Sequence, residues 1–311
     1  MSNINNTIEY IVSETQRDAQ GFVAMCEARY EAIIDGIAKR ISETPASEIV
    51  MLAGPSSAGK TTSARKLSEH LASYGVRSFT ISLDDYYLNR DSSPRLPDGS
   101  PDYETVHALD VPLIVKTLSA LMTDGKTELP EFDFITGTRK PEYRVMEISD
   151  SDVIIVEGLH ALNPIVTDEL PADRLLKLYI NVSSRIYDEK GDIILNKRNM
   201  RFIRRMVRDY HSRASSPEHT FTLWGTVCDG EGKYLFPFRD NADIKINTIH
   251  LYETCVLKDE AIELLSGIKK DSPFYSEAER LVRSLGKFPS IPRAAVPEDS
   301  LIREFIGKKE D

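Results

Sequence analysis

The sequence predicts a three-layer α/β fold, in which helices cover both faces of a mainly parallel sheet. Short apolar runs that are typical of buried strands alternate with segments of helical periodicity. One of these runs leads through a glycine-bounded loop into a helical segment, a unit that recurs in parallel sheets. The composition, 41% hydrophobic and 28% charged over 311 residues, is that of an ordinary globular chain with one large domain or two small ones.

The glycine-bounded loop lies between a strand predicted at 49–53 and a helix predicted at 63–73. Its spacing is G-x-x-x-x-G-K-[ST], the phosphate-loop pattern. The glycines let the backbone approach a ligand closely, and the loop amides with the helix N-terminus stabilise an anion. Lysine and threonine at the end of the pattern offer a positive charge to the β/γ-phosphates and a hydroxyl to Mg²⁺. The stretch therefore predicts a nucleotide phosphate site at Gly54, Ser56, Ser57, Ala58, Gly59, Lys60, Thr61 and Thr62.

The other elements follow from periodicity and from cap and turn residues. An N-terminal helical region is expected at 7–42, with Gly21 as a candidate break and a turn at 44–47. Strands are expected at 76–83, 153–156, 175–182 and 243–248, with edge strands at 129–134 and 139–148. Helices are expected at 109–122, with Asp110 as N-cap and Pro112 in the first turn, at 197–214, from Pro217, and at 252–267, 275–286 and 298–306.

Two carboxylates follow predicted strands, where parallel sheets bind ligands. Asp84 comes after the strand at 76–83, where it can orient and deprotonate a hydroxyl or, alternatively, cap a turn. Glu157 ends the strand at 153–156, the position of an acid that holds Mg²⁺ or its water shell. His160 is as compatible with a core or surface histidine as with a ligand.

The helix at 197–214 would carry arginines on one face, at i, i+3, i+4 and i+7: Arg201, Arg204, Arg205 and Arg208. Ile203, Met206, Val207 and Tyr210 have the same spacing on the opposite side. Few acids stand nearby to pair with this face, which favours a helical lid over a polyphosphate. A solvated face and a nucleic-acid surface remain alternatives.

Charge and cysteine content narrow the class of protein. A net charge of −10 argues against a general nucleic-acid binder. Cys26, Cys228 and Cys255 show no metal or redox spacing and fit a reducing compartment. No signal peptide and no bilayer-spanning apolar run is seen, so a cytoplasmic protein without a membrane or nucleic-acid partner is expected.

Five motifs in this order resemble the uridine kinase and phosphoribulokinase group of P-loop kinases, over roughly residues 48–265. They are Gly-Pro-Ser-Ser-Ala-Gly-Lys-Thr-Thr at 54–62, Ser-Leu-Asp-Asp-Tyr-Tyr at 82–87, Pro-Glu-Phe-Asp-Phe at 130–134, Val-Glu-Gly at 156–158 and Arg-Phe-Ile-Arg-Arg-Met-Val-Arg-Asp at 201–209. The resemblance implies the P-loop NTPase fold with an arginine-bearing helical lid. It also implies ATP and Mg²⁺ as cofactors, and transfer of the γ-phosphoryl to the 5′-hydroxyl of uridine or cytidine.

Site roles are implied by the same resemblance. Asp84 matches the catalytic base, Tyr87 an aromatic residue beside it, and Glu104 the acid that holds the ribose hydroxyls. Arg205 resembles the arginine that reaches the nucleoside and the transferred phosphate. Arg208 and Arg213 resemble the lid arginines on ATP.

The chain departs from the family at the base-reading positions. Uridine kinases usually carry a tyrosine and a histidine that read the pyrimidine edge; here these positions match Phe132 and Gly137, which cannot hydrogen-bond a base. One lid arginine of the family is matched by Ser215. The reaction class is therefore better supported than the identity of the nucleoside.

The resulting interpretation is a kinase with Asp84, Lys60 and Arg205 in catalysis, Thr61 and Glu157 at the metal, and Phe132 in the substrate site. Three units are predicted: an N-terminal helical extension (1–45), a P-loop kinase domain (46–270) and a C-terminal helical tail (271–311). A small-molecule substrate and, from the resemblance, a homo-oligomer are expected. Alternatives are a kinase of a pentose phosphate or pantothenate, and an ATP-hydrolysing regulator.

Overall fold

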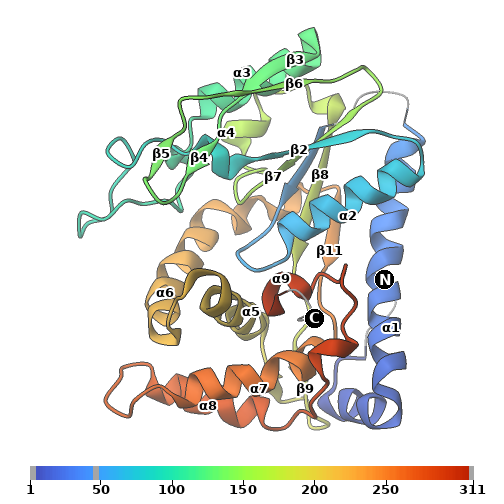
Figure 1. Ribbon diagram of the computed structural model, residues 1–311, viewed down its shortest axis with the longest axis vertical. Coiled ribbons are helices and arrows are strands. Elements are labelled where there is room, and N and C mark those ends of the chain that lie inside the picture. Colours follow the sequence, from blue (N-terminus) through green and yellow to red (C-terminus); the bar gives the residue numbers. More distant parts are fainter. Residues whose placement is uncertain (1–4, 45–48, 308–311) are drawn as a thin grey trace.

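The computed structural model describes residues 5–44 and 49–307 (Figure 1). Within these residues, five strands form one parallel sheet in the order β11-β8-β1-β7-β2. Their bounds are Ile49–Ala53 for β1, Ser78–Ser82 for β2, Val153–Glu157 for β7, Leu175–Asn181 for β8 and Ile244–Asn247 for β11. The predicted three-layer α/β fold with a parallel sheet is therefore confirmed.

Strand β1 lies at the centre of the sheet, where Ile49 is in register with Ile154 of β7 and Leu175 of β8. All five of its residues are buried, as expected for a strand covered on both faces. Alternate side chains enter two separate hydrophobic clusters: Val50 and Leu52 point to one face, and Ile49, Met51 and Ala53 to the other. The carboxyl end of β1 thus opens into the glycine-bounded loop from a rigid support.

The helices enclose the sheet and extend below it in Figure 1. They are α1 Ile8–Ser42, α2 Lys60–Ser73, α3 Val111–Asp124, α4 Pro164–Thr167, α5 Lys197–Arg213, α6 Pro217–Tyr234, α7 Glu253–Ser266, α8 Tyr275–Leu285 and α9 Arg303–Ile306. Asp110 caps α3, as predicted, by accepting from the amide of Leu113, and Ser216 caps α6 by accepting from the amide of His219. Among the described helices, none combines the length and apolarity needed to cross a membrane.

Four predicted elements are corrected. The segments 129–134 and 139–148 are not edge strands of the main sheet; they lie in an antiparallel hairpin arm, where β3 Lys126–Leu129 pairs with β6 Arg144–Glu147 and β4 Phe132–Asp133 pairs with β5 Thr138–Arg139. The first helix is interrupted at Asp18, where φ is −161°, rather than at Gly21, whose amide donates to the Asp18 carboxylate. The helix expected at 298–306 is only the short α9.

Two short strands, β9 Ile186–Tyr187 and β10 Ile193–Leu195, were not predicted because each is too short for a periodic signal. The turn predicted at 44–47 and the boundary at 45/46 fall largely on residues outside the described ranges.

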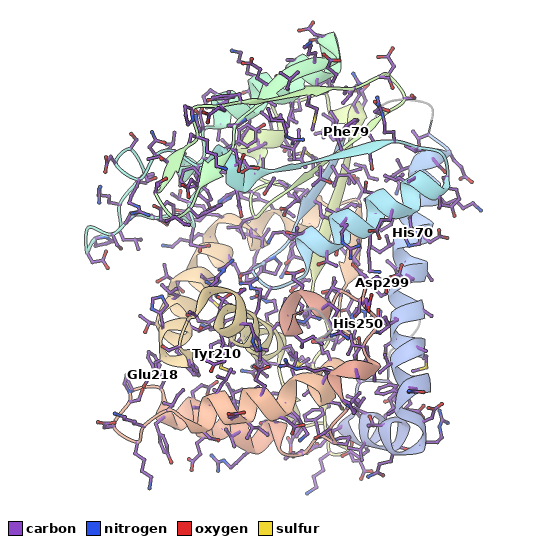
Figure 2. The ribbon with its side chains drawn as sticks, in the orientation of Figure 1. His70, Phe79, Tyr210, Glu218, His250 and Asp299 are labelled. Atoms are coloured by element: carbon purple, nitrogen blue, oxygen red, sulfur yellow. The ribbon has the colours of Figure 1, made fainter. Side chains whose placement is uncertain are left out.

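The N-terminal helix α1 packs along α2 through polar as well as apolar contacts (Figure 1). Glu31 of α1 pairs with both Lys66 and His70 of α2, and Figure 2 shows His70 where these two helices run side by side. The apolar residues of α1 belong to the same hydrophobic cluster as the sheet face beneath α2 and as Phe305 near the C-terminus. Segments from both ends of the chain therefore share one core with the sheet.

Candidate active site

The glycine-bounded loop connects β1 to α2, and its two glycines are required by close contacts. A Cβ atom on Gly54 would lie 2.5 Å from the carbonyl oxygen of Ile180, and one on Gly59 would lie 2.6 Å from Leu301. Gly59 also has φ +89°, a left-handed conformation that favours glycine. No described side chain caps the N-terminus of α2, which leaves its first amides for an anion. Lys60 begins this helix, so its charge adds to that of the amides.

Glu157 ends β7 beside the start of α2 and is almost fully buried. It accepts from the hydroxyl of Thr61 at 3.4 Å and from that of Ser82 at 3.0 Å. Burial raises the pKa of the Glu157 carboxyl, and the charge of Lys60 opposes that shift.

These groups fit a magnesium ion that binds together with a nucleotide. Within the described residues, no set of three histidine, cysteine or acidic side chains could enclose a metal ion. Mg²⁺ commonly binds one or two protein groups and completes its shell with water and phosphate oxygens. The Thr61 hydroxyl and the Glu157 carboxylate supply such a partial set.

Asp84 lies two residues beyond β2, in the short 3₁₀ helix Leu83–Tyr86, where its amide donates to Ser82 Oγ. The Asp84 side chain is exposed to a cleft, and the walls of this cleft enclose it on the other sides. This enclosure raises the pKa of the Asp84 carboxyl, while the charges of Lys60 and Arg213 lower it. A carboxylate held between enclosure and two cations suits a proton acceptor.

The cleft beside Asp84 has a volume of about 690 Å³. The structure brings the predicted residues Asp84, Tyr87, Glu104, Phe132 and Arg213 together in its wall. Gly137, which the resemblance placed at a base-reading position, also lines this cleft. Sequence reasoning missed four further wall residues, because their place depends on the hairpin arm and on the loop before it: Arg90, Tyr103, Phe134 and Ile135.

Glu104 is a second carboxylate of this cleft whose pKa is raised. Burial, with the charge of Glu231 as a second contribution, raises the pKa of Glu104 to about 7, although Arg205 and Lys60 oppose the shift. The carboxyl therefore changes charge near neutral pH.

Nearby His160 is buried in the core, where loss of hydration lowers its pKa to about 4 and keeps the imidazole neutral.

Three arginines of α5 gather around one buried carboxylate, that of Asp209. Its oxygens lie 3.2 Å from Arg205 Nε, 2.7 Å from Arg208 Nη2 and 3.5 Å from Arg213 Nη1. Arg205 also donates to Ser56 Oγ in the phosphate loop at 2.9 Å. One negative charge cannot neutralise three positive ones, so the cluster retains an excess positive charge next to the phosphate loop.

The prediction that few acids pair with the arginine face of α5 is wrong. Arg205 and Arg208 share the carboxylate of Asp209, and the other two arginines of the face each have an acidic partner of their own. Arg201 pairs with Glu231 of α6, and Arg204 pairs with Glu253 of α7, and all four side chains are buried. Both guanidinium groups also donate to the phosphate loop, Arg201 to the Ser56 carbonyl at 3.0 Å and Arg204 to the Ser57 carbonyl at 3.3 Å. The two arginines therefore hold the phosphate loop in place through its backbone carbonyl groups.

The apolar side of α5 also differs from the prediction at one position. Ile203, Met206 and Val207 are buried, whereas Tyr210 is 48% exposed, and Figure 2 shows it at the far end of α5.

Residues of α1 and α9 contact the end of the phosphate loop and the first turn of α2, which the sequence did not indicate. Tyr30 of α1 forms a hydrogen bond with Ser63 (2.7 Å between hydroxyl oxygens), and Thr62 Oγ1 donates to Glu304 of α9 at 2.6 Å. Leu301 covers Gly59.

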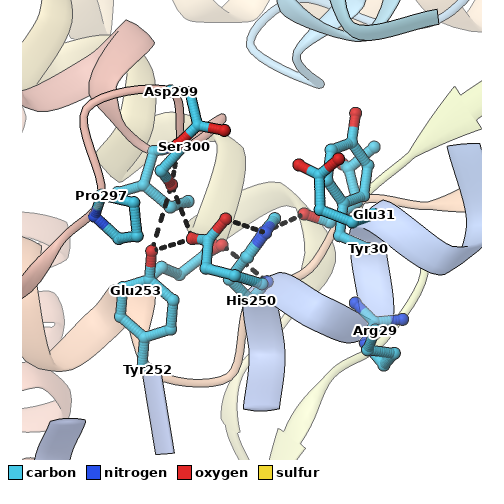
Figure 3. Close-up of polar contacts among 12 residues, drawn as sticks. Arg29, Tyr30, Glu31, His250, Tyr252, Glu253, Pro297, Asp299 and Ser300 are labelled. Atoms are coloured by element: carbon cyan, nitrogen blue, oxygen red, sulfur yellow. Dashed lines mark hydrogen bonds and ion pairs between the residues drawn. The ribbon is translucent and has the colours of Figure 1, made fainter. Parts of the chain in front are cut away.

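A buried polar network joins α1, the start of α7 and the C-terminal segment (Figure 3). Ser300 donates to Glu27 of α1 at 2.6 Å and lies 3.2 Å from the hydroxyl of Tyr252. The amide of His250 donates to Glu253, which holds Arg204. The loop is therefore fixed from several sides before any ligand binds.

A phosphate-binding loop, two carboxylates at strand ends and an arginine cluster define a P-loop kinase, and comparison with known proteins gives the family. The model of the Phosphoribulokinase / Uridine kinase family matches residues 49–254. The chain belongs to this family. Helix α1 and the residues after 254 lie outside the matched range.

Two relatives illustrate the similarity. The chain is 29% identical to the uridine kinase of Lactobacillus helveticus (strain DPC 4571) over 197 residues, which are 63% of this chain and 84% of that one. It is also 29% identical to uridine-cytidine kinase C of Dictyostelium discoideum over 199 residues, 64% of this chain and 38% of that one.

A solved structure shows the same fold. The chain matches a protein from Silicibacter sp. TM1040, assigned there as a fructose transport system kinase, with a TM-score of 0.50 and 16% identity. The match covers 70% of this chain and 98% of that one. At this identity the likeness concerns the fold alone.

Proposed function

We propose that the protein is an ATP- and Mg²⁺-dependent kinase that phosphorylates the 5′-hydroxyl of a pyrimidine nucleoside. The observation that carries the proposal is the cleft at Asp84, which adjoins the phosphate loop and also contains Glu104 and the aromatic side chains of Tyr87 and Phe132. A carboxylate, a second acid and flat apolar faces suit a hydroxyl, a ribose and a base, respectively. The similarity to uridine kinases supports the same substrate class.

In the proposed mechanism, the 5′-hydroxyl oxygen of the nucleoside forms a bond to the γ-phosphorus of ATP while Asp84 accepts the proton of that hydroxyl, and ADP leaves. The raised pKa of Asp84 makes it a better proton acceptor, and Lys60 and Arg213 oppose that shift, which helps to keep it ionised. Lys60 and the phosphate-loop amides hold the phosphates. Arg205, Arg208 and Arg213 stabilise the charge that develops on the transferred phosphoryl group.

Thr61 and Glu157 would hold Mg²⁺, which supplies charge neutralisation at the phosphate oxygens. Glu157 is kept in place by the hydroxyl of Ser82, so its free oxygen is oriented before the ion binds. Glu104 would accept hydrogen bonds from the ribose hydroxyls and orient the nucleoside against Asp84.

An acceptor screen tests this function. Purified protein is incubated with ATP, Mg²⁺ and uridine, cytidine, purine nucleosides, ribulose 5-phosphate or pantothenate, and products are identified by mass. ATP consumption that depends on a pyrimidine nucleoside, and is lost in Lys60→Ala, is the expected result. Turnover only with ribulose 5-phosphate or pantothenate would show that the protein is a kinase of another substrate class. ATP hydrolysis that does not depend on an acceptor would favour an ATP-hydrolysing regulatory protein.

A further inference from the structure

We infer that Arg90 determines acceptor specificity by donating two hydrogen bonds to the base, so that the site prefers cytosine to uracil. The inference rests on the proposed nucleoside kinase activity. It concerns the part of the cleft formed by the hairpin arm, where Arg90, Phe132, Phe134, Ile135 and Gly137 line the wall. Arg90 is the charged residue in this part of the wall.

Backbone pairing fixes Arg90 against the hairpin arm. Its amide donates to the carbonyl oxygen of Gly137 at 2.8 Å, and the adjacent Asn89 side chain accepts from the amide of Arg139 at 3.0 Å. These two bonds attach the loop after the 3₁₀ helix to β5. Arg90 is therefore placed by the main chain, not by chance surface contact.

The guanidinium of Arg90 occupies the space that a side chain at position 137 would fill. A Cβ atom on Gly137 would lie 2.6 Å from Arg90 Nε and 2.8 Å from Cζ and Nη2. Gly137 also has φ +71°, so glycine is favoured there by conformation as well as by space. The guanidinium of Arg90 can therefore lie here only because residue 137 has no side chain.

Arg90 differs from the other arginine of the cleft in its charge balance. Arg213 lies 3.5 Å from Asp209, whereas Arg90 has no ion pair among the residues that the structure describes. Its donors therefore remain available to a ligand in the cleft.

The aromatic residues beside Arg90 favour a flat ring as that ligand. The ring of Phe132 lies 5.7 Å from that of Tyr87 and 5.1 Å from that of Phe134, between ring centres. Phe134 is 60% exposed, so the faces of this cluster are only partly covered by protein. A carboxylate or phosphate would satisfy the guanidinium but would leave these apolar faces without a partner.

The donors of arginine discriminate between the two pyrimidines. A guanidinium only donates, and its planar fork fits two adjacent acceptors. Cytosine presents N3 and O2 as adjacent acceptors. Uracil carries a hydrogen on N3, which would face a donor and leave it unpaired. The hairpin residues that line the cleft, Phe132, Phe134, Ile135 and Gly137, have no side-chain acceptor for that hydrogen.

The test compares kcat/KM for cytidine and uridine in the wild type, Arg90→Met and Arg90→Lys, with ATP-free binding of cytidine measured by calorimetry. The wild type should prefer cytidine by about tenfold or more, the effect of one lost hydrogen bond to a charged group. Arg90→Met should lower kcat/KM for cytidine about 10–100-fold through KM, change uridine little and leave the KM for ATP unchanged. Arg90→Lys, which keeps the charge without the fork, should also lose the preference.

Arg95→Met is the matched control, because Arg95 is exposed in the neighbouring loop, where it donates to the carbonyl oxygen of Gly99. It should keep the wild-type preference. If both nucleosides are phosphorylated and Arg90→Met leaves their ratio unchanged, the assignment of Arg90 is wrong and the proposed function stands. If the wild type accepts no nucleoside, the proposed function fails; turnover of a sugar phosphate that falls in Arg90→Met would then identify Arg90 as an anion site.

Discussion

Replacing Glu231 with glutamine should destabilise the protein and loosen the phosphate loop together. Glu231 accepts from Arg201 through both carboxylate oxygens, at 2.6 and 2.7 Å, and from the amide of Ser56 at 2.8 Å. Its side chain is 0% exposed and that of Arg201 is 5% exposed. Glutamine has nearly the same shape, but its amide nitrogen is a donor and it carries no charge. Arg201 would be left buried without its counter-charge.

Removing one partner of a buried ion pair costs about 3–5 kcal/mol. For a chain of this length each kcal/mol lowers Tm by roughly 2 °C, so the expected decrease is about 6–10 °C. The KM for ATP should also rise, because Ser56 lies in the loop that Glu231 and Arg201 brace. The KM for the nucleoside should change less.

Thermal unfolding monitored by circular dichroism and steady-state kinetics measure the two effects. The control is Glu277→Gln in α8, which breaks an ion pair with Arg280 whose side chains are 47% and 42% exposed. Exposed pairs contribute at most about 1 kcal/mol, so the control should shift Tm by no more than about 2 °C. If Glu231→Gln behaved like this control in both measurements, the view that buried arginines brace the phosphate loop would be refuted.

Three further predictions concern other parts of the site. Asp84→Asn should lower kcat by about 10²–10⁴ with little change in ATP binding, whereas Asp98→Asn in the exposed loop should not; near wild-type turnover would remove Asp84 from proton transfer. The nucleoside kcat/KM should rise as pH increases through about 7, where Glu104 becomes a carboxylate, and Glu104→Gln should abolish that rise. The pKa of Glu104 in the folded protein lies above its usual value of 4.5, so ionisation of Glu104 destabilises the folded state once the pH exceeds 4.5. Glu104→Gln should therefore raise Tm at pH 8 but not at pH 4; an equal change of Tm at both would show that the pKa of Glu104 is not raised by folding. Leu301→Ala should cost about 2–5 kcal/mol and raise the KM for ATP, whereas Leu285→Ala, equally buried but in α8, should cost as much without changing KM; equal KM effects would argue against a role for Leu301 at the loop.

Much of the site could be predicted because its signals are local. The loop from Gly54 to Thr62 lies within one short stretch, and Asp84 and Glu157 follow apolar strands directly. In a parallel sheet these strand ends meet at one edge, so their proximity followed from topology alone. The structure places Asp84 two residues past the end of β2, a small displacement that keeps it beside the loop.

The partners of α5 could not be predicted, because they are distant in sequence. Glu231 and Glu253 lie 30 and 49 residues from Arg201 and Arg204, on helices whose packing no periodicity reveals. A helical projection shows four similar arginines. Two of them are held by buried acids of other helices, whereas Arg205 and Arg208 share the carboxylate of Asp209 within α5. The two pairs differ in burial, because the side chains of Arg201 and Arg204 are less exposed than those of Arg205 and Arg208.

The role of the chain ends was likewise hidden. Glu304 contacts the phosphate loop at Thr62 and Tyr30 contacts the next residue, Ser63; neither Glu304 nor Tyr30 belongs to a motif. The pairing of Arg90 with Gly137 depends on a hairpin arm that the sequence suggested only as edge strands. In each case the missing information is the register or packing of elements that are far apart in the chain.

The most direct test of the proposed activity is to locate the phosphate on the product. Cytidine and γ-¹⁸O-labelled ATP are incubated with the protein and Mg²⁺, and the product is analysed by ³¹P NMR and mass spectrometry. The proposal predicts a 5′-monophosphate that carries the labelled phosphoryl group, formed in equal amount to ADP and about 10²–10⁴ times more slowly with Asp84→Asn. Labelled inorganic phosphate with unchanged cytidine would contradict it.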